Sequence, residues 1–239
     1  MENLNILNDV MLSDNVTEQF KTALSNKDFR TWLTSIMPEI EDCEKQQQDN
    51  PWHIYDCLDH ILHSVEEMNK QTTNLSNEDR RLLAYSMLYH DIGKPACHIR
   101  RFGKAYGREI DSFFNHNKKS AEIAKRSAGQ FGFDEKETKI IQKLVYDHDI
   151  FMFITEEKNG NPHHKFLTKE LITEHVNELS EYGDGKQLME YLIMIGRSDN
   201  KAQNPEMTAK SLKMLDNMEN MLKSMDPSEF ETQKQKAGT

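Results

Sequence analysis

The chain has 239 residues, with 30 lysines and arginines against 40 aspartates and glutamates, which gives a formal net charge of −10. A protein this acidic has little non-specific attraction for polyanions, so binding to extended nucleic acid is not expected, although a local basic patch could hold one phosphate. The three cysteines, Cys43, Cys57 and Cys97, form no CxxC pair, which argues against a disulfide framework or a zinc ribbon.

The sequence carries no pattern typical of export or of membrane insertion. Its N-terminus has no basic region followed by an apolar stretch, and no apolar run approaches the length that crosses a membrane. We therefore expect a cytoplasmic protein that makes no membrane contact.

The apolar residues recur with helical spacing, and only 6 prolines and 10 glycines interrupt the chain. Residues 1–15 are polar and expected to be loose, residues 96–115 and 155–165 have the character of loops, and a polar tail follows Pro227. Helices are expected over residues 16–37, 54–68, 77–90, 116–131, 135–147, 168–179, 185–197 and 207–225. Helices in this order without intervening strands predict an all-α fold, an orthogonal helical bundle.

The adjacent pair His90 and Asp91 stands at the expected end of one helix. Divalent metals such as Mn²⁺, Fe²⁺, Co²⁺ and Ni²⁺ favour mixed imidazole and carboxylate ligands. Two adjacent ligands at the end of a rigid helix can bind the same ion. Their partners should lie near apolar stripes, because buried polar groups must be paired or metal-bound. His60 lies inside an apolar helix, and Asp199 follows Ile195 by four residues on the same helical face.

Two further histidines, His116 and His148, each begin or end an expected helix. The ordered series of histidines and aspartates from His60 to Asp199 resembles that of the HD-domain superfamily of metal-dependent phosphohydrolases. The central motif of that superfamily matches HDIGKP at residues 90–95.

Four segments are similar to the HD domain of bacterial CCA-adding tRNA nucleotidyltransferases, and the likeness covers roughly residues 35–205. The segments are residues 50–60, 114–121 and 143–148, and the run Arg197-Ser-Asp199, which stands where a final Ala-Asp is usual. Only about 50 residues precede the first of these segments, and they lack strand-borne Gly-Ser and Asp-x-Asp motifs, so the nucleotidyltransferase head and nucleotide addition are not expected. We expect a helical extension over residues 1–40, a single HD domain over 41–205, and a C-terminal helix with a polar tail over 206–239.

The resemblance implies which residues bind metal. It gives one or two divalent ions (Mn, Fe, Ni, Co or Mg) as the cofactor. The core ligands would be His60, His90, Asp91 and Asp199; in dinuclear members two further histidines, here His116 and His148, bind a second ion that Asp91 bridges. The alternative for His116 and His148 is that they are core or supporting histidines. His53, near His60 in sequence, is expected at the rim of the site and not as a ligand.

The expected chemistry is hydrolysis of a phosphomonoester or phosphodiester in a small nucleotide-like substrate. A divalent ion lowers the pKa of its bound water from ~15.7 toward ~7, and Asp91 would orient that water. Lys94 can reach a phosphoryl oxygen and offset its charge. Arg100, Arg101 and Lys104 lie in a glycine-containing segment and are predicted to bind the substrate phosphate; the alternative is a solvated surface loop.

Two other functions fit the same residues. In the first, the HD fold is a non-catalytic module that binds a ligand or a partner. In the second, the six ligands hold a di-iron centre for oxidation, as in some HD-type oxygenases. The full set of ligands favours an enzyme over a module, and Lys94 with the basic segment favours phosphate chemistry over oxidation.

Overall fold

The computed structural model describes residues 2–156 and 163–231. Helices dominate this part of the chain, and strands occur in it only as two small two-stranded sheets. The predicted all-α fold, a helical bundle, is therefore confirmed. Among the described helices none is both long and apolar enough to cross a membrane.

The α-helices follow one another along most of the chain. They are α1 (Glu2–Met11), α2 (Val16–Ser25), α3 (Lys27–Ile36), α4 (Glu39–Lys45), α5 (Cys57–Gln71), α6 (Asn77–His90), α7 (His116–Ser127), α8 (Glu135–Asp147), α9 (Lys169–Leu179), α10 (Gly185–Lys201), α11 (Pro205–Ser224) and α12 (Pro227–Glu231). Short 3-10 turns are η1 (Pro95–Cys97), η2 (Ala128–Phe131) and η3 (His148–Phe153).

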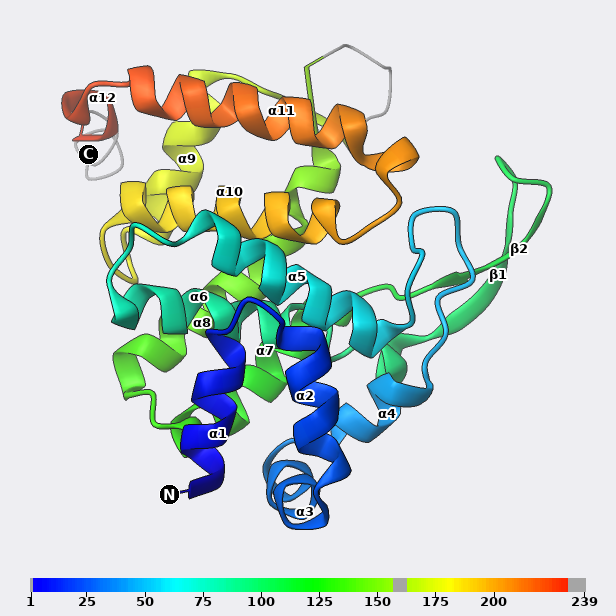
Figure 1. Cartoon of the computed structure of the whole chain (residues 1–239). Helices are drawn as coiled ribbons and strands as arrows, with labels where there is room; N and C mark the ends of the chain where they lie inside the picture. Colours follow the sequence, from blue (N-terminus) through cyan, green and yellow to red (C-terminus); the bar gives the residue numbers. More distant parts are fainter. Residues whose placement is uncertain (1, 157–162, 232–239) are drawn as a thin grey trace.

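The centre of the molecule is formed by α5, α6 and α10, which pack against one another (Figure 1). Helix α11 runs alongside α10 at the top of Figure 1, and α7 and α8 pack together beside α6. Helices α1 to α4 lie at the bottom of Figure 1, away from α11. One buried apolar cluster extends from Leu7 in α1 to Met225 after α11. The N-terminal helices thus share the core of the bundle; the domain boundaries at residues 40 and 205 stay predictions.

The expectation that residues 1–15 are loose was wrong, because residues 2–11 form α1. Leu7, Val10 and Met11 are buried at helical spacing on one face of this helix. The side-chain oxygen of Asn8 also accepts hydrogen bonds, from Tyr85 Oη at 2.8 Å and from Arg81 Nε at 3.1 Å. A helix that looks polar in isolation is therefore held by tertiary contacts.

The two expected loops contain strands, which corrects the prediction of helices alone. Residues 96–115 include an antiparallel hairpin of β1 (Ile99–Gly103) and β2 (Arg108–Ser112), with Gly107 at φ +64° in its turn. It projects from the bundle on the right of Figure 1. The loop at 155–165 is flanked by a two-residue parallel pair, β3 (Ile154–Thr155) and β4 (Lys165–Phe166); residues 157–162 and the tail at 232–239 lie outside the described residues.

Two glycines allow close contacts between elements that carry the candidate metal ligands. A Cβ at Gly93 would lie 2.7 Å from the backbone nitrogen of Ser120, so only glycine lets the segment after α6 approach α7 this closely. The Gly93 amide donates to Ser120 Oγ at 2.9 Å. At Gly196, a Cβ would lie 2.6 Å from the ring of Phe151, which packs η3 against α10.

Candidate metal centre

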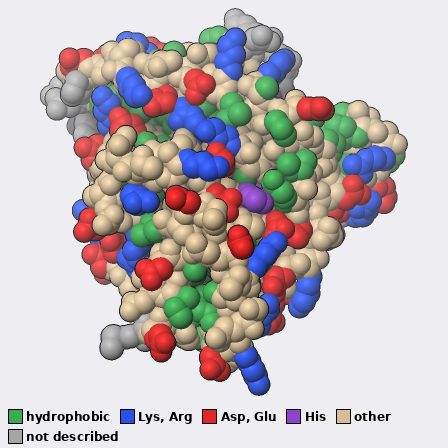
Figure 2. All heavy atoms as spheres, viewed as in Figure 1, with side chains coloured by type: hydrophobic (Ala, Val, Ile, Leu, Met, Phe, Trp, Pro, Cys, Tyr) green, Lys and Arg blue, Asp and Glu red, His purple; other side chains and the backbone are tan. Residues whose placement is uncertain are grey.

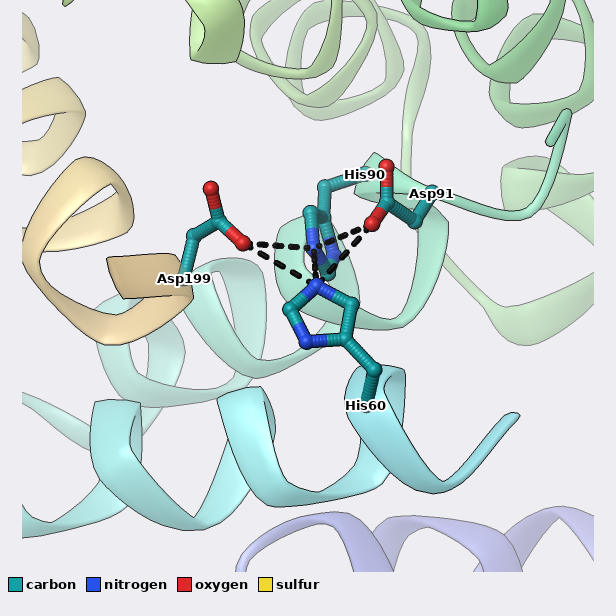
Figure 3. A group of neighbouring side chains, drawn as sticks. All are labelled: His60, His90, Asp91 and Asp199. Atoms are coloured by element: carbon teal, nitrogen blue, oxygen red, sulfur yellow. Dashed lines mark hydrogen bonds and ion pairs between the residues drawn. The ribbon is translucent and has the colours of Figure 1, made fainter. Parts of the chain in front are cut away.

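Four side chains from three helices converge beside the C-terminal end of α6 (Figure 3). These residues, the first cluster, are His60 of α5, His90 and Asp91 at the end of α6, and Asp199 of α10. His60 Nε2 lies 3.0 Å from Asp91 Oδ2 and 3.0 Å from Asp199 Oδ1. His90 Nε2 lies 3.3 Å from Asp91 Oδ2 and 3.6 Å from Asp199 Oδ1. Two imidazoles and two carboxylates thus face one small volume.

A second cluster lies on the other side of Asp91 and consists of Asp91, His116 and His148. His116 Nε2 is 3.0 Å from Asp91 Oδ1, and His148 Nε2 is 3.7 Å from the same oxygen. The two histidine Nε2 atoms are 3.2 Å apart. Since Oδ2 of Asp91 faces the first cluster and Oδ1 the second, this carboxylate has the position of a bridge between two ions.

All four histidines are oriented by a backbone carbonyl. The acceptors of their Nδ1 atoms are the carbonyls of Ala202 for His60 (3.2 Å), Met87 for His90 (2.6 Å), Phe113 for His116 (2.8 Å) and Val145 for His148 (2.7 Å). A carbonyl can only accept, so each Nδ1 carries a hydrogen and each neutral ring presents the Nε2 lone pair to its cluster. Metal-binding histidines are typically oriented in this way.

The electrostatics of the first cluster favour a cation between its side chains. Burial raises the pKa of both Asp91 and Asp199, but nearby positive charge and histidine donors outweigh burial and hold these pKa values well below the usual range. Burial lowers the pKa of His90, yet the charge of Asp91 and the carboxylate of Asp199 raise it to about 9. Without metal, protons on the imidazoles therefore balance the carboxylates. Imidazole nitrogen and carboxylate oxygen suit borderline divalent metals, so both clusters fit such ions.

Lys94 is buried beside Asp91, and each hydrogen of its ammonium has an acceptor. Lys94 Nζ lies 2.6 Å from Asp91 Oδ2, donates to Gln48 Oε1 at 2.8 Å and is 3.2 Å from His53 Nε2. An ammonium has three hydrogens, and each has one acceptor here. The sequence analysis missed Gln48, because it stands in a polar run with no pattern that separates it from a linker.

His53 lies next to the first cluster but outside it. Its ring centroid is 5.0 Å from that of His60, and its Nε2 faces Lys94. Within the described residues, His53 Nδ1 is buried and has no hydrogen-bond partner. This placement agrees with the expected position near the site without ligating metal; the role itself stays a prediction.

Two polar residues beside the clusters were not singled out from the sequence. Asp149 Oδ2 lies 3.2 Å from His116 Nε2, and its Oδ1 lies 3.4 Å from His148 Nε2. Gln203 Nε2 donates to Asp199 Oδ1 at 2.8 Å. The one available signal for Asp149 was its position directly after His148.

The predicted phosphate-binding residues lie on the β1–β2 hairpin and make no described ion pair or hydrogen bond with the two clusters. Arg100 pairs with Asp49 at 2.7 Å and with Asp111 at 3.0 Å. Arg101 Nε donates to Ser112 Oγ at 2.7 Å, and Lys104 is exposed near the turn. Figure 2 shows basic and acidic side chains intermixed on the projecting part of the surface at the right.

The centre is open to solvent on one side. The side chains of Asp149, Asp199 and His116 are 21%, 15% and 12% exposed, whereas His60, His90 and Asp91 are essentially closed off. A small molecule would therefore approach between the ends of α7, η3 and α10.

Comparison with known families agrees with this geometry. The sequence model of the HD domain matches residues 53–221, well over half of the chain, and the matched region includes both clusters. The chain belongs to the HD domain family.

Proposed function

We propose that the protein is a metal-dependent phosphohydrolase that cleaves a phosphomonoester or phosphodiester bond in a small nucleotide-like substrate. The observation that carries this proposal is the shared carboxylate of Asp91, which faces two histidines on each side and a buried ammonium, Lys94. Membership of a family whose members are typically metal-dependent phosphohydrolases supports the same activity.

The first cluster would hold one ion and the second cluster another, with Asp91 common to both. Divalent ions bound there supply Lewis acidity and lower the pKa of a bound water. Asp91, held by Lys94 and by the surrounding imidazoles, keeps its carboxylate ionised and fixed in orientation. Lys94 contributes a permanent positive charge at the position where negative charge develops on a phosphoryl group.

The charge of the centre supports an anionic substrate only when metal is present. With neutral histidines, the carboxylates of Asp91, Asp199 and Asp149 outnumber the single ammonium of Lys94. One divalent ion cancels this excess, and a second makes the centre positive. A phosphate group is therefore attracted most strongly to a centre that holds two ions.

An exposed aromatic ring close in sequence to His116 supports a nucleotide-like substrate. Phe114 precedes His116 by two residues, exposes 58% of its surface and lies under the guanidinium of Arg101 at 5.2 Å. An exposed aromatic face beside a cation can stack on a base while the phosphate lies toward the metal ions.

Metal analysis combined with a substrate screen tests the proposal. The purified protein, reconstituted with Mn²⁺, Co²⁺ or Ni²⁺, should retain at least about one equivalent of metal and hydrolyse a member of a panel of phosphomonoesters, cyclic nucleotides and dinucleotides. Asp91→Ala should abolish hydrolysis, because it removes a ligand common to both clusters.

Other outcomes point to the alternative functions. A folded protein that holds metal but cleaves none of these compounds would contradict hydrolysis and indicate a binding module. Oxygen consumption by the iron-loaded protein, without phosphate release, would indicate an oxygenase. Metal content below about a tenth of an equivalent after reconstitution would contradict the metal centre itself.

A further inference from the structure

The two clusters differ in their number of carboxylates. The first cluster has two histidines and two carboxylates, Asp91 and Asp199. The second cluster has two histidines but only Asp91. An ion in the second cluster would thus have one protein ligand fewer, unless a further side chain reaches it.

Asp149 lies close enough to the second cluster to be that further ligand. It is the second residue of η3, directly after His148, and its two oxygens lie 3.2 Å from His116 Nε2 and 3.4 Å from His148 Nε2. Both rings donate their Nδ1 hydrogen to backbone carbonyls, so their neutral forms present lone pairs toward Asp149. A carboxylate that faces two lone pairs at this distance needs a positive charge between them.

No lysine or arginine side chain fulfils this role in the described structure. Within residues 2–156 and 163–231, the ion pairs of Asp149 are with His116 and His148 alone, and no lysine or arginine pairs with it. By contrast, Asp147, two residues earlier, is neutralised by Lys143 at 2.9 Å. Asp149 is therefore a carboxylate whose charge is directed into the second cluster.

We propose that Asp149 is a ligand of the ion in the second cluster, which then has two histidines and two carboxylates, like the first. This rests on the proposed function, since it assumes that the two clusters bind metal. Asp149 is also the most exposed member of the centre, so its carboxylate would bind the ion from the open side and leave fewer positions for water and substrate there.

Titration of the metal-free full-length protein with Mn²⁺ tests the proposal, with calorimetry for affinity and electron paramagnetic resonance for coupling between two ions. The wild-type protein should bind two ions that are magnetically coupled. Asp149→Asn should bind the second ion at least about 10-fold more weakly, a loss on the scale of removing a group that supports a metal site. The affinity of the first ion should change by less than about two-fold, because Asp149 makes no described contact with Asp199, His60 or His90.

Three further variants provide the controls. His116→Ala should weaken the same ion as Asp149→Asn, and Asp149→Glu should restore part of the affinity, since it keeps a carboxylate. Glu135→Gln removes an exposed carboxylate from α8, the helix that leads to His148, and should leave both affinities unchanged. Circular dichroism of each metal-free variant verifies that it is folded.

Equal affinity of wild type and Asp149→Asn for both ions would overturn the proposal, as would a wild type that binds only one ion. A folded Asp149→Asn that loses both ions together would also overturn it, since a ligand of the second cluster alone cannot have that effect. If the wild type binds two ions and Asp149→Asn loses one, yet no phosphate ester is hydrolysed, the ligand assignment stands and the proposed function fails.

Discussion

Lys94 Nζ lies 2.6 Å from Asp91 Oδ2, and both side chains are buried. The other two hydrogens of the Lys94 ammonium face Gln48 and His53. The ammonium therefore has no hydrogen for another acceptor unless one of these contacts breaks. Lys94 therefore has two roles that can be separated. It neutralises Asp91 when metal is absent, and we propose that it supplies charge next to the phosphoryl group when metal and substrate are bound.

Lys94→Met should destabilise the metal-free protein much more than the metal-loaded protein. Removing one partner of a buried ion pair costs about 3–5 kcal/mol, which for a chain of this size lowers Tm by roughly 6 °C or more. In the metal-loaded protein the ion neutralises the charge of Asp91, so the loss of stability should be smaller. Thermal melts with EDTA and with Mn²⁺ measure the difference. Lys139→Met, which removes an exposed ion pair with Glu135, should change Tm little in either condition. If Lys94→Met lowers Tm equally with and without metal, this interpretation is wrong.

The stability of the metal-free protein should fall as pH rises from about 6.5 to about 9. The pKa of His90 in the folded protein is raised to about 9, above the ordinary value of about 6.5. A raised pKa means that protonated His90 stabilises the fold fully below about pH 6.5, and that this contribution is lost as pH rises through the folded-state value. The effect is on the order of 3 kcal/mol.

Urea unfolding at several pH values, in the presence of EDTA, measures this slope. His90→Gln should have a much shallower slope over the same range, because it lacks the titrating group. A wild-type protein whose stability is flat across this pH range would show that His90 is not protonated in the metal-free state. Metal-loaded protein should lack the slope, since the ion replaces the proton.

The central motif was readable from the sequence because its residues are contiguous. His90, Asp91 and Lys94 stand in six neighbouring letters, and the partners His60 and Asp199 lie on apolar helical faces, where a buried polar residue needs a ligand or a partner. These features, read together with the resemblance to the HD-domain superfamily, predicted which side chains the structure brings together.

Asp149 and Gln48 could not be found in the same way. Each acts through a contact that depends on where a loop or a 3-10 turn places it, and neither position has a pattern in the sequence. The secondary structure was predicted wrongly for similar reasons. Helix α1 depends on contacts with residues some 70 positions away. Strand β1 is mostly exposed and β2 is buried over its last three residues, so neither strand has the alternation of polar and apolar residues that marks a half-buried strand.

His60→Ala should reduce metal binding far more than His53→Ala. His60 Nε2 lies within 3.0 Å of two carboxylates, whereas His53 contacts Lys94 and makes no described contact with either carboxylate. We expect a loss of at least about 100-fold in Mn²⁺ affinity for His60→Ala and less than about 10-fold for His53→Ala, the range for a supporting residue. Calorimetric titration of each variant measures both values. The reverse order would make His53 the ligand.

Arg101 and Arg100 are neighbours on β1, but their charges are not equally available, and this leads to opposite expectations for substrate binding. The guanidinium of Arg100 is paired with Asp49 and Asp111. Arg101 instead lies over the exposed ring of Phe114, and its described side-chain hydrogen bond is to the neutral Ser112. Arg101→Ala should raise KM several-fold at nearly constant kcat, because it removes binding that is equal in the ground state and the transition state. Arg100→Ala should leave KM within about two-fold, since the charge of Arg100 is already neutralised by two carboxylates. Lys94→Ala, in contrast, should lower kcat on the order of 10²-fold, the scale for one electrostatic donor. Steady-state kinetics on the best substrate of the screen, at fixed metal content, separate these cases; if Arg100→Ala raises KM as much as Arg101→Ala does, the ion pairs with Asp49 and Asp111 must open when substrate binds.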